Sequence, residues 1–225
     1  MTYITMIKII EESDSWLIIN KPSGTSVHND KESVIEFFKE KGTTTTPVHR
    51  IDKDTSGLLL LSKNTESVNA LQTSLSKSSK MYIAICRGKV NENEGTWLDQ
   101  LSEKAEGFKN PRGKKSDLKD CITSWKKIYS NKYFSLILFK IETGRTHQIR
   151  RHCAIHKLEI IGDKRYGDSK YQKMIKNKYS FHKMALHSYK LDIEINNNPK
   201  HFTADIPNYF NDLIGEKVEK LLQES

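Results

Sequence analysis

Four consecutive leucines, Leu58 to Leu61, constrain the fold of this chain more than any other feature of its sequence. The run is short and uniformly apolar, and it lies between the turn-forming segments Ser56-Gly57 and Ser62-Lys63-Asn64. A run of this length with such flanks favours a strand over a helix. We therefore predict a fully buried strand, preceded by a rigidly held loop.

That preceding loop carries the densest set of chemically useful side chains. It reads His49-Arg50-Ile51-Asp52-Lys53-Asp54-Thr55-Ser56-Gly57, so a carboxylate, Asp52, follows a cation, Arg50, at the mouth of the predicted strand. The same residues are also good turn formers, since Asp and Ser bond their own backbone and Gly accepts a positive φ. A plain structural turn is therefore the alternative to a functional loop.

The charge balance indicates a polyanionic partner. The chain has 225 residues, which suits one large domain or two small lobes, and 37 Lys and Arg against 28 Asp and Glu give a formal charge of +9. Cationic side chains that contact phosphates release counterions and so raise affinity for nucleic acids. A basic surface that serves only solubility is the alternative.

The cysteines and the hydropathy pattern favour a cytoplasmic protein. Cys86, Cys121 and Cys153 are odd in number and form no Cys-x-x-Cys pair, so we expect reduced thiols. No apolar run approaches the roughly 20 residues of a membrane span, and acidic residues interrupt the N-terminal segment where a signal peptide needs an apolar stretch. We expect no membrane association.

Hydrophobic periodicity and turn residues predict the elements of the first half of the chain. They are a strand over 7–20, a turn over 21–24, a helix over 33–41 that Ser33 caps and Gly42 stops, a helix over 65–77, and a strand over 81–90 that ends at a hairpin-like turn over 91–95.

The second half begins with a charged segment and then returns to regular structure. Residues 98–120 predict an exposed loop or insertion, in which Arg112, Lys114, Lys115 and Lys119 either contact an RNA backbone or are simply solvated. The elements expected after it are strands over 121–130 and 133–142, a helix over 146–156, strands over 184–195 and 199–206, and an amphipathic helix over 207–223.

Several motifs in sequence order resemble one family. HRIDKDTSG followed by leucines resembles the active-site motif of the RluA-type pseudouridine synthases, with Ile51 where the family usually has Leu. The other segments with family-like order and spacing are Lys21-Pro22-Ser23-Gly24, Lys80-Met81-Tyr82-Ile83-Ala84, Gly144-Arg145-Thr146-His147-Gln148-Ile149-Arg150, Ile161-Gly162-Asp163 with Tyr166-Gly167, and Leu186-His187.

The resemblance implies an α+β fold, with a mixed, mostly antiparallel central sheet, flanking helices and a central RNA-binding cleft. It also implies one catalytic domain over residues 1–225, without the ribosomal-protein-like RNA-binding domain that some members carry, because the pattern begins near residue 7. The implied partner is tRNA or ribosomal RNA, and we expect no DNA partner and a monomer. Residues 162–168 are similar to the tRNA-acting branch, while ribosomal RNA stays open.

The implied activity is the isomerisation of uridine to pseudouridine in RNA, an intramolecular transfer of the base. The bond between ribose and base must break, the base must rotate, and a carbon bond must form. No outside energy is required, so we expect no metal, nucleotide or redox cofactor. The resemblance assigns the essential carboxylate to Asp52, which either attacks the anomeric carbon or removes a neighbouring ribose proton.

Two further residues are implied to be catalytic. Arg150 corresponds to the family's arginine that pairs with the catalytic aspartate, and a nearby cation favours the ionised carboxylate. Tyr82 corresponds to the active-site tyrosine, whose ring stacks on the flipped base and whose hydroxyl is a candidate for taking the proton from carbon 5. An ordinary surface arginine and an ordinary sheet aromatic are the alternatives.

Five residues are expected to bind or orient the substrate. Arg50 is expected to fill the gap left by the flipped nucleotide, since extruding a base costs a few kcal/mol. Leu186 is expected to line an apolar wall beside the uracil, or else to be a core leucine. Lys21 is expected to contact phosphate, and Arg145 and Thr146 are expected to shape the turn that presents Arg150.

Two other functions stay open. His147, His152, Cys153 and His156 form a metal-like cluster, which makes a zinc-dependent hydrolase the rival enzyme. A non-catalytic RNA-binding or chaperone module of the same fold is the second rival. Loss of activity with retained RNA affinity in Asp52→Asn would separate this module from an enzyme.

Overall fold

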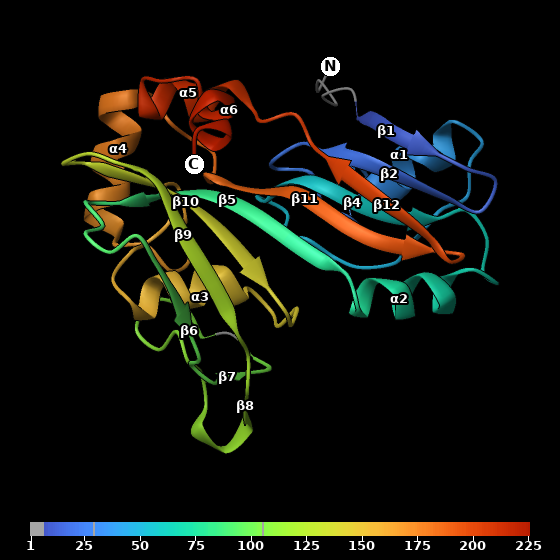
Figure 1. Ribbon diagram of the computed structural model, residues 1–225, viewed down its shortest axis with the longest axis horizontal. Coiled ribbons are helices and arrows are strands. Elements are labelled where there is room, and N and C mark those ends of the chain that lie inside the picture. The colour runs from blue at the N-terminus through green and yellow to red at the C-terminus, as the bar shows by residue number, and fades with distance from the viewer. Residues whose placement is uncertain (1–6, 29, 105) are drawn as a thin grey trace. The chain divides into compact units, whose positions relative to one another are not determined.

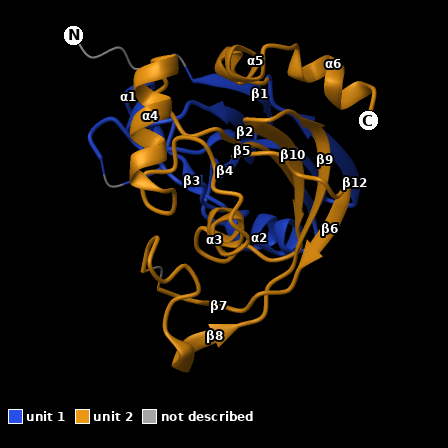
Figure 2. Cartoon of the chain, turned by 90° about the vertical axis from the view of Figure 1, so that its left-hand side faces the viewer, with its two compact units in different colours: residues 1–80, 187–205 blue, residues 81–186, 206–225 orange. Residues whose placement is uncertain are grey.

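A computed structural model describes residues 7–28, 30–104 and 106–225, and the chain divides into two compact units (Figures 1 and 2). The first unit consists of residues 1–80 and 187–205, and the second of residues 81–186 and 206–225. Each unit combines β-strands with helices. The expected α+β class, with a mixed and mostly antiparallel sheet, is therefore confirmed.

The first unit is built on strands in the order β1-β2-β4-β11-β12, with the short β3 also paired to β4. Only the pair β4–β11 is parallel among the strand pairs described in this unit. The strands are β1 (Lys8–Glu12), β2 (Trp16–Lys21), β3 (Thr46–Pro47), β4 (Ser56–Ser62), β11 (Leu186–Ile195, all but its first residue in this unit) and β12 (Asn198–Thr203), and the helices are α1 (Val34–Glu40) and α2 (Val68–Ser76).

Strand β4 contains the four leucines, and all seven of its residues are buried. Because side chains alternate along a strand, the leucines divide between two clusters. Leu58 and Leu60 pack with Trp16, Leu71 and Phe202, whereas Leu59 and Leu61 lie in a separate cluster with residues of β2 and α1. The predicted buried strand is confirmed.

Gly57 permits β11 to approach β4. Its φ is +108°, a conformation that residues with a Cβ rarely adopt, and it pairs with Ser188 of β11. A Cβ placed on Gly57 would lie 2.1 Å from the backbone oxygen of Ser188. The contact is with backbone, so no side-chain rotation relieves it.

We predict that Gly57→Ala lowers the free energy of unfolding by about 2–4 kcal/mol, through backbone strain and displacement of β11. Urea unfolding measures this change. Gly144→Ala is the matched control, because Gly144 has no positive φ and a Cβ there meets no atom within 4 Å. Equal losses in the two variants would contradict the assigned role of Gly57.

The second unit contains strands in the order β5-β10-β9-β6, with a separate two-stranded finger, β7 and β8. Figure 2 shows this unit in orange, with the finger at the bottom. The strands are β5 (Ser79–Arg87, from its third residue), β6 (Glu94–Trp97), β7 (Leu101–Ser102), β8 (Leu118–Lys119), β9 (Thr123–Ser130) and β10 (Phe134–Ile141), and the helices are α3 (Gln148–Ile155), α4 (Ser169–Tyr179), α5 (Asn208–Ile214), α6 (Val218–Gln223) and a 3-10 turn, η1 (Lys115–Asp117).

The predicted helices over 33–41, 65–77 and 146–156 are confirmed as α1, α2 and α3, with ends shifted by a few residues. Ser33 caps α1 by accepting the backbone N–H of Glu36, and Gly42 follows α1 with a φ of +78°. No helix in the described part of the chain is long and apolar enough to cross a membrane.

Three element predictions were wrong, and one helix was missed. The strand over 7–20 is two antiparallel strands, β1 and β2, because Ser13 bonds the backbone of Trp16 and turns the chain. Residues 91–95 make no hairpin, since β6 pairs with β9. The C-terminal helix breaks at Gly215, which has a φ of +79°. Helix α4 was not predicted at all.

The segment 98–120, expected to be an exposed loop or insertion, is largely irregular and exposed in its described residues, but it is anchored as a finger. Leu101 is fully buried in it, and β7 pairs with β8. The buried Arg151 of α3 donates to the carbonyl oxygens of Ser102 at 2.7 Å, Pro111 at 2.6 Å and Arg112 at 2.7 Å. The finger is thereby fastened to α3.

The basic residues expected on this segment differ in their surroundings. Arg112 is ion-paired with Asp99, and Lys119 is ion-paired with Glu103. Lys114 and Lys115 are exposed. Two of the four cations therefore serve contacts within the finger.

All three cysteines are free thiols in the second unit, and all three are buried. Burial raises the pKa of Cys121, and burial together with the neighbouring Cys86 raises the pKa of Cys153 well above its ordinary value. The three sulfur atoms are therefore both unpaired and shielded from solvent in this structure.

Candidate active site

In the first unit, Asp52 lies on the loop between β3 and β4. It is half-buried between the buried Ile51 and the turn that leads to β4, and its carbonyl oxygen accepts the N–H of Thr55 at 3.0 Å. Ile51 packs in the same cluster as Leu59 and Leu61. The residues that flank Asp52 are therefore held by the core and by a closed turn.

Lys21, at the end of β2, holds this loop in place through hydrogen bonds. Its ammonium group donates to the carbonyl oxygens of Pro22 at 3.0 Å, Thr25 at 2.8 Å and Lys53 at 3.0 Å. The carbonyl oxygen of Lys53 also accepts the N–H of Gly24 at 2.9 Å. The turn over 22–25 and the Asp52 loop are thus joined by one buried cation.

The environment of Lys21 favours a structural role over the expected phosphate contact. Its side chain is fully buried, and its three ammonium donors are all used by backbone carbonyls. Burial lowers the pKa of Lys21 to about 7, while the carboxylates of Asp52 and Asp54 act in the opposite direction. Lys21 therefore lies within electrostatic reach of Asp52.

His49 completes the hydrogen bonding of β4. Its Nε2 accepts the backbone N–H of Leu60 at 3.1 Å, so this nitrogen carries no proton and the ring is neutral. Burial of the ring, and then the charge of Lys80, lower the pKa of His49 to about 4. His49 is the first residue of the motif, but its role in the hydrogen bonding of β4 was not predicted from the sequence.

We predict that His49 makes the protein acid-sensitive. Between about pH 6.5 and pH 4 the unfolded chain binds a proton at this residue and the folded chain does not, so stability falls as pH falls, by about 3 kcal/mol over this range. His49→Gln, which keeps an acceptor for Leu60, should show a shallower decline in urea unfolding. The exposed His182→Gln should decline as steeply as wild type.

In the second unit, Arg150 forms a buried two-point ion pair with Asp163. Its Nε lies 2.7 Å from Oδ2 of Asp163 and its Nη2 lies 2.9 Å from Oδ1. Oδ1 also accepts the backbone N–H groups of Arg165 at 2.9 Å and Tyr166 at 3.1 Å. Asp163 therefore fixes the direction of the Arg150 guanidinium, a role that the sequence analysis did not assign.

Tyr166 and His147 support the same arginine. The Arg150 guanidinium lies 5.1 Å from the centroid of the Tyr166 ring, and the Tyr166 hydroxyl is 2.9 Å from Nδ1 of His147. His147 precedes α3 with a φ of +53°. The segments 144–150 and 161–167, quoted separately in the sequence, are thus one hydrogen-bonded group.

Arg145 and Thr146 lie on the exposed turn before α3, as expected. Gln148 closes this turn: its Oε1 accepts the N–H of Arg145 at 3.1 Å, and its Nε2 donates to the carbonyl oxygen of Ile122 at 2.9 Å. Thr146 contributes its carbonyl oxygen to Arg151. The sequence analysis did not assign Gln148 this role, although the residue lies within the quoted motif.

Tyr82 and Leu186 lie in one apolar cluster with Ile149 and Cys153 of α3. Their exposed fractions are 8% and 4%. The structure therefore brings these two expected substrate-contacting residues and the helix of Arg150 together in the second unit. Arg50, in the first unit, is exposed.

We predict that Asp163→Asn lowers the free energy of unfolding by about 3 kcal/mol, since a buried guanidinium loses its counter-charge. Asp30→Asn is the matched control, because the Asp30–Lys53 pair has a similar distance, 2.9 Å, but is exposed, and we expect no measurable change. Chemical denaturation of both variants is the measurement. A negligible loss in Asp163→Asn would mean that Arg150 does not depend on this partner.

The metal-like cluster does not assemble. In residues 7–28, 30–104 and 106–225 no group of three or more His, Cys, Asp or Glu side chains is arranged to hold a metal ion. Nε2 of His152 lies 3.0 Å from the carbonyl oxygen of Asp99, and Nε2 of His156 lies 2.6 Å from its carboxylate. These histidines fasten the base of the finger.

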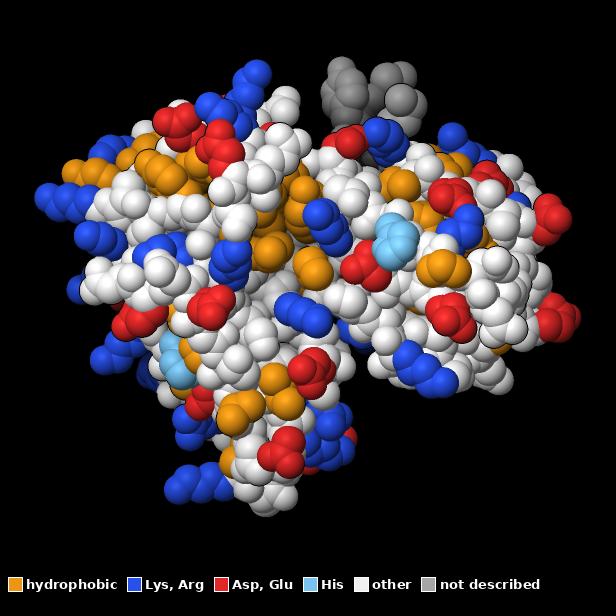
Figure 3. Space-filling model, in the orientation of Figure 1, with side chains coloured by type: hydrophobic (Ala, Val, Ile, Leu, Met, Phe, Trp, Pro, Cys, Tyr) orange, Lys and Arg blue, Asp and Glu red, His pale blue; other side chains and the backbone are white. Residues whose placement is uncertain are grey.

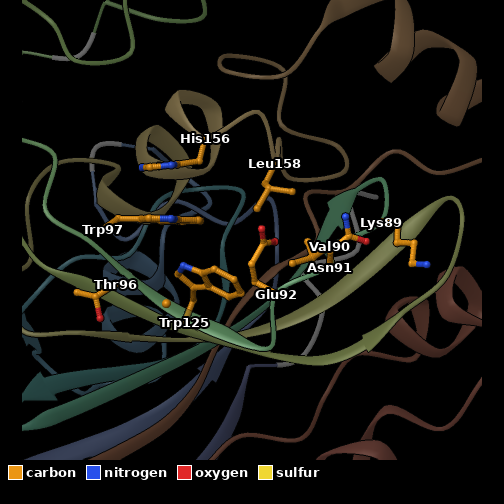
Figure 4. A pocket seen from close by; sticks show the side chains of 10 residues that line it. Lys89, Val90, Asn91, Glu92, Thr96, Trp97, Trp125, His156 and Leu158 are labelled. Atoms are coloured by element: carbon orange, nitrogen blue, oxygen red, sulfur yellow. The ribbon is translucent and has the colours of Figure 1, made fainter.

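A separate pocket of about 420 Å³ opens in the second unit (Figure 4). Trp97, Trp125, His156 and Glu92 are among its lining residues, and the rings of Trp97 and His156 are stacked at 4.5 Å. None of the residues that the sequence predicted for catalysis or substrate binding lines it. The pocket is therefore separate from the predicted catalytic and substrate-binding residues.

Solved structures share this fold. The human protein titled RNA Pseudouridylate Synthase Domain Containing 1 superposes with a TM-score of 0.77 over 99% of this chain and 96% of its own, at 20% identity. Human RNA Pseudouridylate Synthase Domain Containing 4 gives a TM-score of 0.76 at 18% identity, over 92% of each chain. The architecture is that of pseudouridylate synthases.

Sequence relatives carry the assignment further. An RNA pseudouridine synthase of Zymomonas mobilis is 35% identical over 88% of this chain and 92% of its own length. Ribosomal large subunit pseudouridine synthase D of Borreliella burgdorferi is 31% identical over 91% of this chain, which spans 66% of that protein. tRNA pseudouridine synthase C of Vibrio parahaemolyticus is 29% identical over 82% of this chain and 83% of its own.

The model of the RNA pseudouridylate synthase family matches residues 15–155, which include the Asp52 loop, Tyr82 and α3. This chain belongs to that family.

Proposed function

We propose that this protein is an isomerase that converts particular uridines to pseudouridine in tRNA or ribosomal RNA. Family membership and the names of its relatives support the reaction class. The observation that carries the proposal is the placement of Asp52, a half-buried carboxylate on a loop that Lys21, Ile51 and Thr55 hold in place.

The proposed chemistry uses one carboxylate and no cofactor. Asp52 either attacks the anomeric carbon or removes a ribose proton, which breaks the bond between the ribose and N1 of uracil. The base then rotates and carbon 5 bonds to the anomeric carbon, which releases Asp52 from that carbon in the first route and is followed by return of the proton to the ribose in the second. Carbon 5 then gives up its proton, and N1, freed from the ribose, takes one up. Tyr82 is the proposed stacking partner of the uracil and a candidate acceptor of that proton.

Arg150 is proposed to keep the catalytic carboxylate ionised. Its direction is set by Asp163, which supports a role that needs precise placement. Arg50, exposed at the loop, is proposed to occupy the space of the flipped nucleotide, and Leu186 to line the apolar wall. Arg145 and Thr146 are proposed to shape the turn that presents Arg150.

We also propose that residues 1–225 act as one catalytic domain, as a cytoplasmic monomer on RNA and not on DNA. One family model matches residues 15–155, which include the Asp52 loop and α3, and this match supports a single catalytic domain. Light scattering of the purified protein tests the monomer, and competition of labelled tRNA with duplex DNA tests the preference for RNA.

We predict that Asp52→Asn abolishes pseudouridine formation while RNA affinity stays within about twofold of wild type, because charge at one position is lost and shape is kept. The matched control is Asp54→Asn, an exposed carboxylate two residues further on, which should remain active. Chemical mapping of pseudouridine in tRNA and ribosomal RNA, from cells that lack the gene and carry each variant, gives the readout.

The same map names the substrate. Sites that vanish with the gene and return with wild type and Asp54→Asn, but not with Asp52→Asn, establish the enzyme and its target. Sites that return with Asp52→Asn would reject Asp52 as the catalytic residue. If no site changes, catalysis on these RNAs is rejected and the non-catalytic RNA-binding module becomes the better account.

A further inference from the structure

The positive charge of the chain is concentrated in one stretch, most of which lies outside the proposed active site. Residues 164–183 contain seven Lys and Arg and a single carboxylate, Asp168, so this stretch carries a net +6 of the total +9. The Asp168 side chain caps α4 by accepting the N–H of Tyr171 at 2.8 Å. The only carboxylate of this stretch therefore serves as the N-cap of α4.

Helix α4 presents this charge to solvent. Lys170, Lys173, Lys176 and Lys178 are all exposed, and Ile175 is the residue of α4 that is buried. At helical spacing, Lys170 and Lys173 lie on the side opposite Ile175, Lys176 lies on a flank, and Lys178 lies one turn from Ile175 on the same side. No described carboxylate forms an ion pair with any of them.

Exposed aromatic rings lie among these cations. Tyr133, on the turn before β10, is 54% exposed, and Tyr179, at the end of α4, is 36% exposed. The ammonium of Lys178 lies 5.6 Å from the Tyr133 ring centroid and 5.2 Å from that of Tyr179, and Lys132 lies 5.8 Å from Tyr133. The turn and the helix therefore form one surface.

We call this surface the α4 platform and define it by Lys132, Tyr133, Lys170, Lys173, Lys176, Lys178 and Tyr179. In Figure 3, Lys and Arg side chains crowd the left-hand side of the molecule, where Figure 1 shows α4 and the turn between β9 and β10. All of its members belong to the second unit.

We propose that the α4 platform is a docking surface for RNA, which binds the sugar-phosphate backbone through its lysines and stacks an unpaired base on Tyr133. This deepens the proposed function and rests on it. Lysines that contact phosphates release counterions, and a base stacks on an exposed aromatic ring whatever its sequence. The platform supplies affinity and orientation, and the chemistry takes place elsewhere.

The composition of the platform favours RNA over an anionic membrane. A membrane-binding helix needs a broad apolar face for insertion between lipids. On α4 the apolar face is occupied by the buried Ile175, and Met174 is its exposed aliphatic residue, at 47%. Solvent-exposed tyrosines bordered by lysines suit bases and phosphates.

The test compares two double variants that each remove two exposed lysines. Lys173→Gln/Lys176→Gln changes the α4 platform, and Lys217→Gln/Lys220→Gln changes the C-terminal segment, where Glu216 and Glu219 lie beside the lysines. Fluorescence anisotropy measures the affinity for labelled bulk tRNA, and separately for a labelled ribosomal RNA fragment, over a series of salt concentrations.

For the RNA class that this enzyme modifies, we expect the platform variant to weaken binding about fivefold or more and to reduce the slope of log Kd against log salt by about one to two, since each phosphate contact contributes about 0.7–0.9. The control variant should change both quantities much less. Equal effects of the two variants would overturn the proposal, as would a platform variant that loses adsorption to phosphatidylserine vesicles and keeps its RNA affinity.

Tyr133 tests the stacking step separately. Tyr133→Ala should weaken binding of a single-stranded RNA about tenfold, and Tyr133→Phe, which keeps the ring, should restore it. Failure of Tyr133→Phe to restore affinity, or no effect of Tyr133→Ala, would overturn the stacking role.

The proposed function and the platform fail in different ways. If wild type forms no pseudouridine, the proposed reaction is rejected, and the docking proposal falls with it. If wild type is active, and the platform variant matches the control in both affinity and reaction rate at low RNA concentration, the platform alone is rejected. Thermal unfolding of each variant confirms that the comparison is between folded proteins.

Discussion

The rest of the first unit depends on satisfying the hydrogen bonds of a strand that water cannot reach. Strand β4 is buried along its whole length, so each of its N–H and C=O groups needs a protein partner. β2 lies along one edge. On the other edge, β11 pairs only at Ser56 and Gly57, and β3 only at Leu61 and Ser62. The N–H of Leu60 donates to Nε2 of His49, and the carbonyl oxygen of Leu60 accepts the N–H of Val48. The chain that leads to Asp52 therefore completes the core.

Two buried cations organise the loops in the same way. Lys21 and Arg151 are both fully buried, and both donate their hydrogen bonds mainly to backbone carbonyls. A buried ammonium or guanidinium is costly unless its donors are satisfied, and several carbonyls satisfy them at once. Each cation thereby joins segments distant in sequence: Lys21 joins two turns beside Asp52, and Arg151 joins the finger to α3. Arg150, by contrast, has a carboxylate partner that fixes its direction.

The sequence predicted those features that follow from local pattern. The leucine run, the caps Ser33 and Gly42, and the helix over 146–156 depend on spacing and turn residues, and the structure confirms them. Features set by contacts between distant residues escaped prediction. No local pattern around Asp163 predicts that it pairs with Arg150. The sequence before β6 is typical of a hairpin turn, but β6 pairs with the distant strand β9. Helix α4 has a single buried residue, Ile175, so it lacks the apolar periodicity by which the other helices were found.

The buried thiols can report on local opening of the second unit. Cys86, Cys121 and Cys153 lie on β5, just before β9, and on α3, so they sample three separate parts of the unit. Thiol reagents react with the thiolate, which is the nucleophile, and burial both shields the sulfur atoms and disfavours that form at Cys121 and Cys153. Alkylation of the native protein therefore has to wait for local opening of the chain. Its rate at each cysteine, followed by mass spectrometry, measures how often that part of the unit opens.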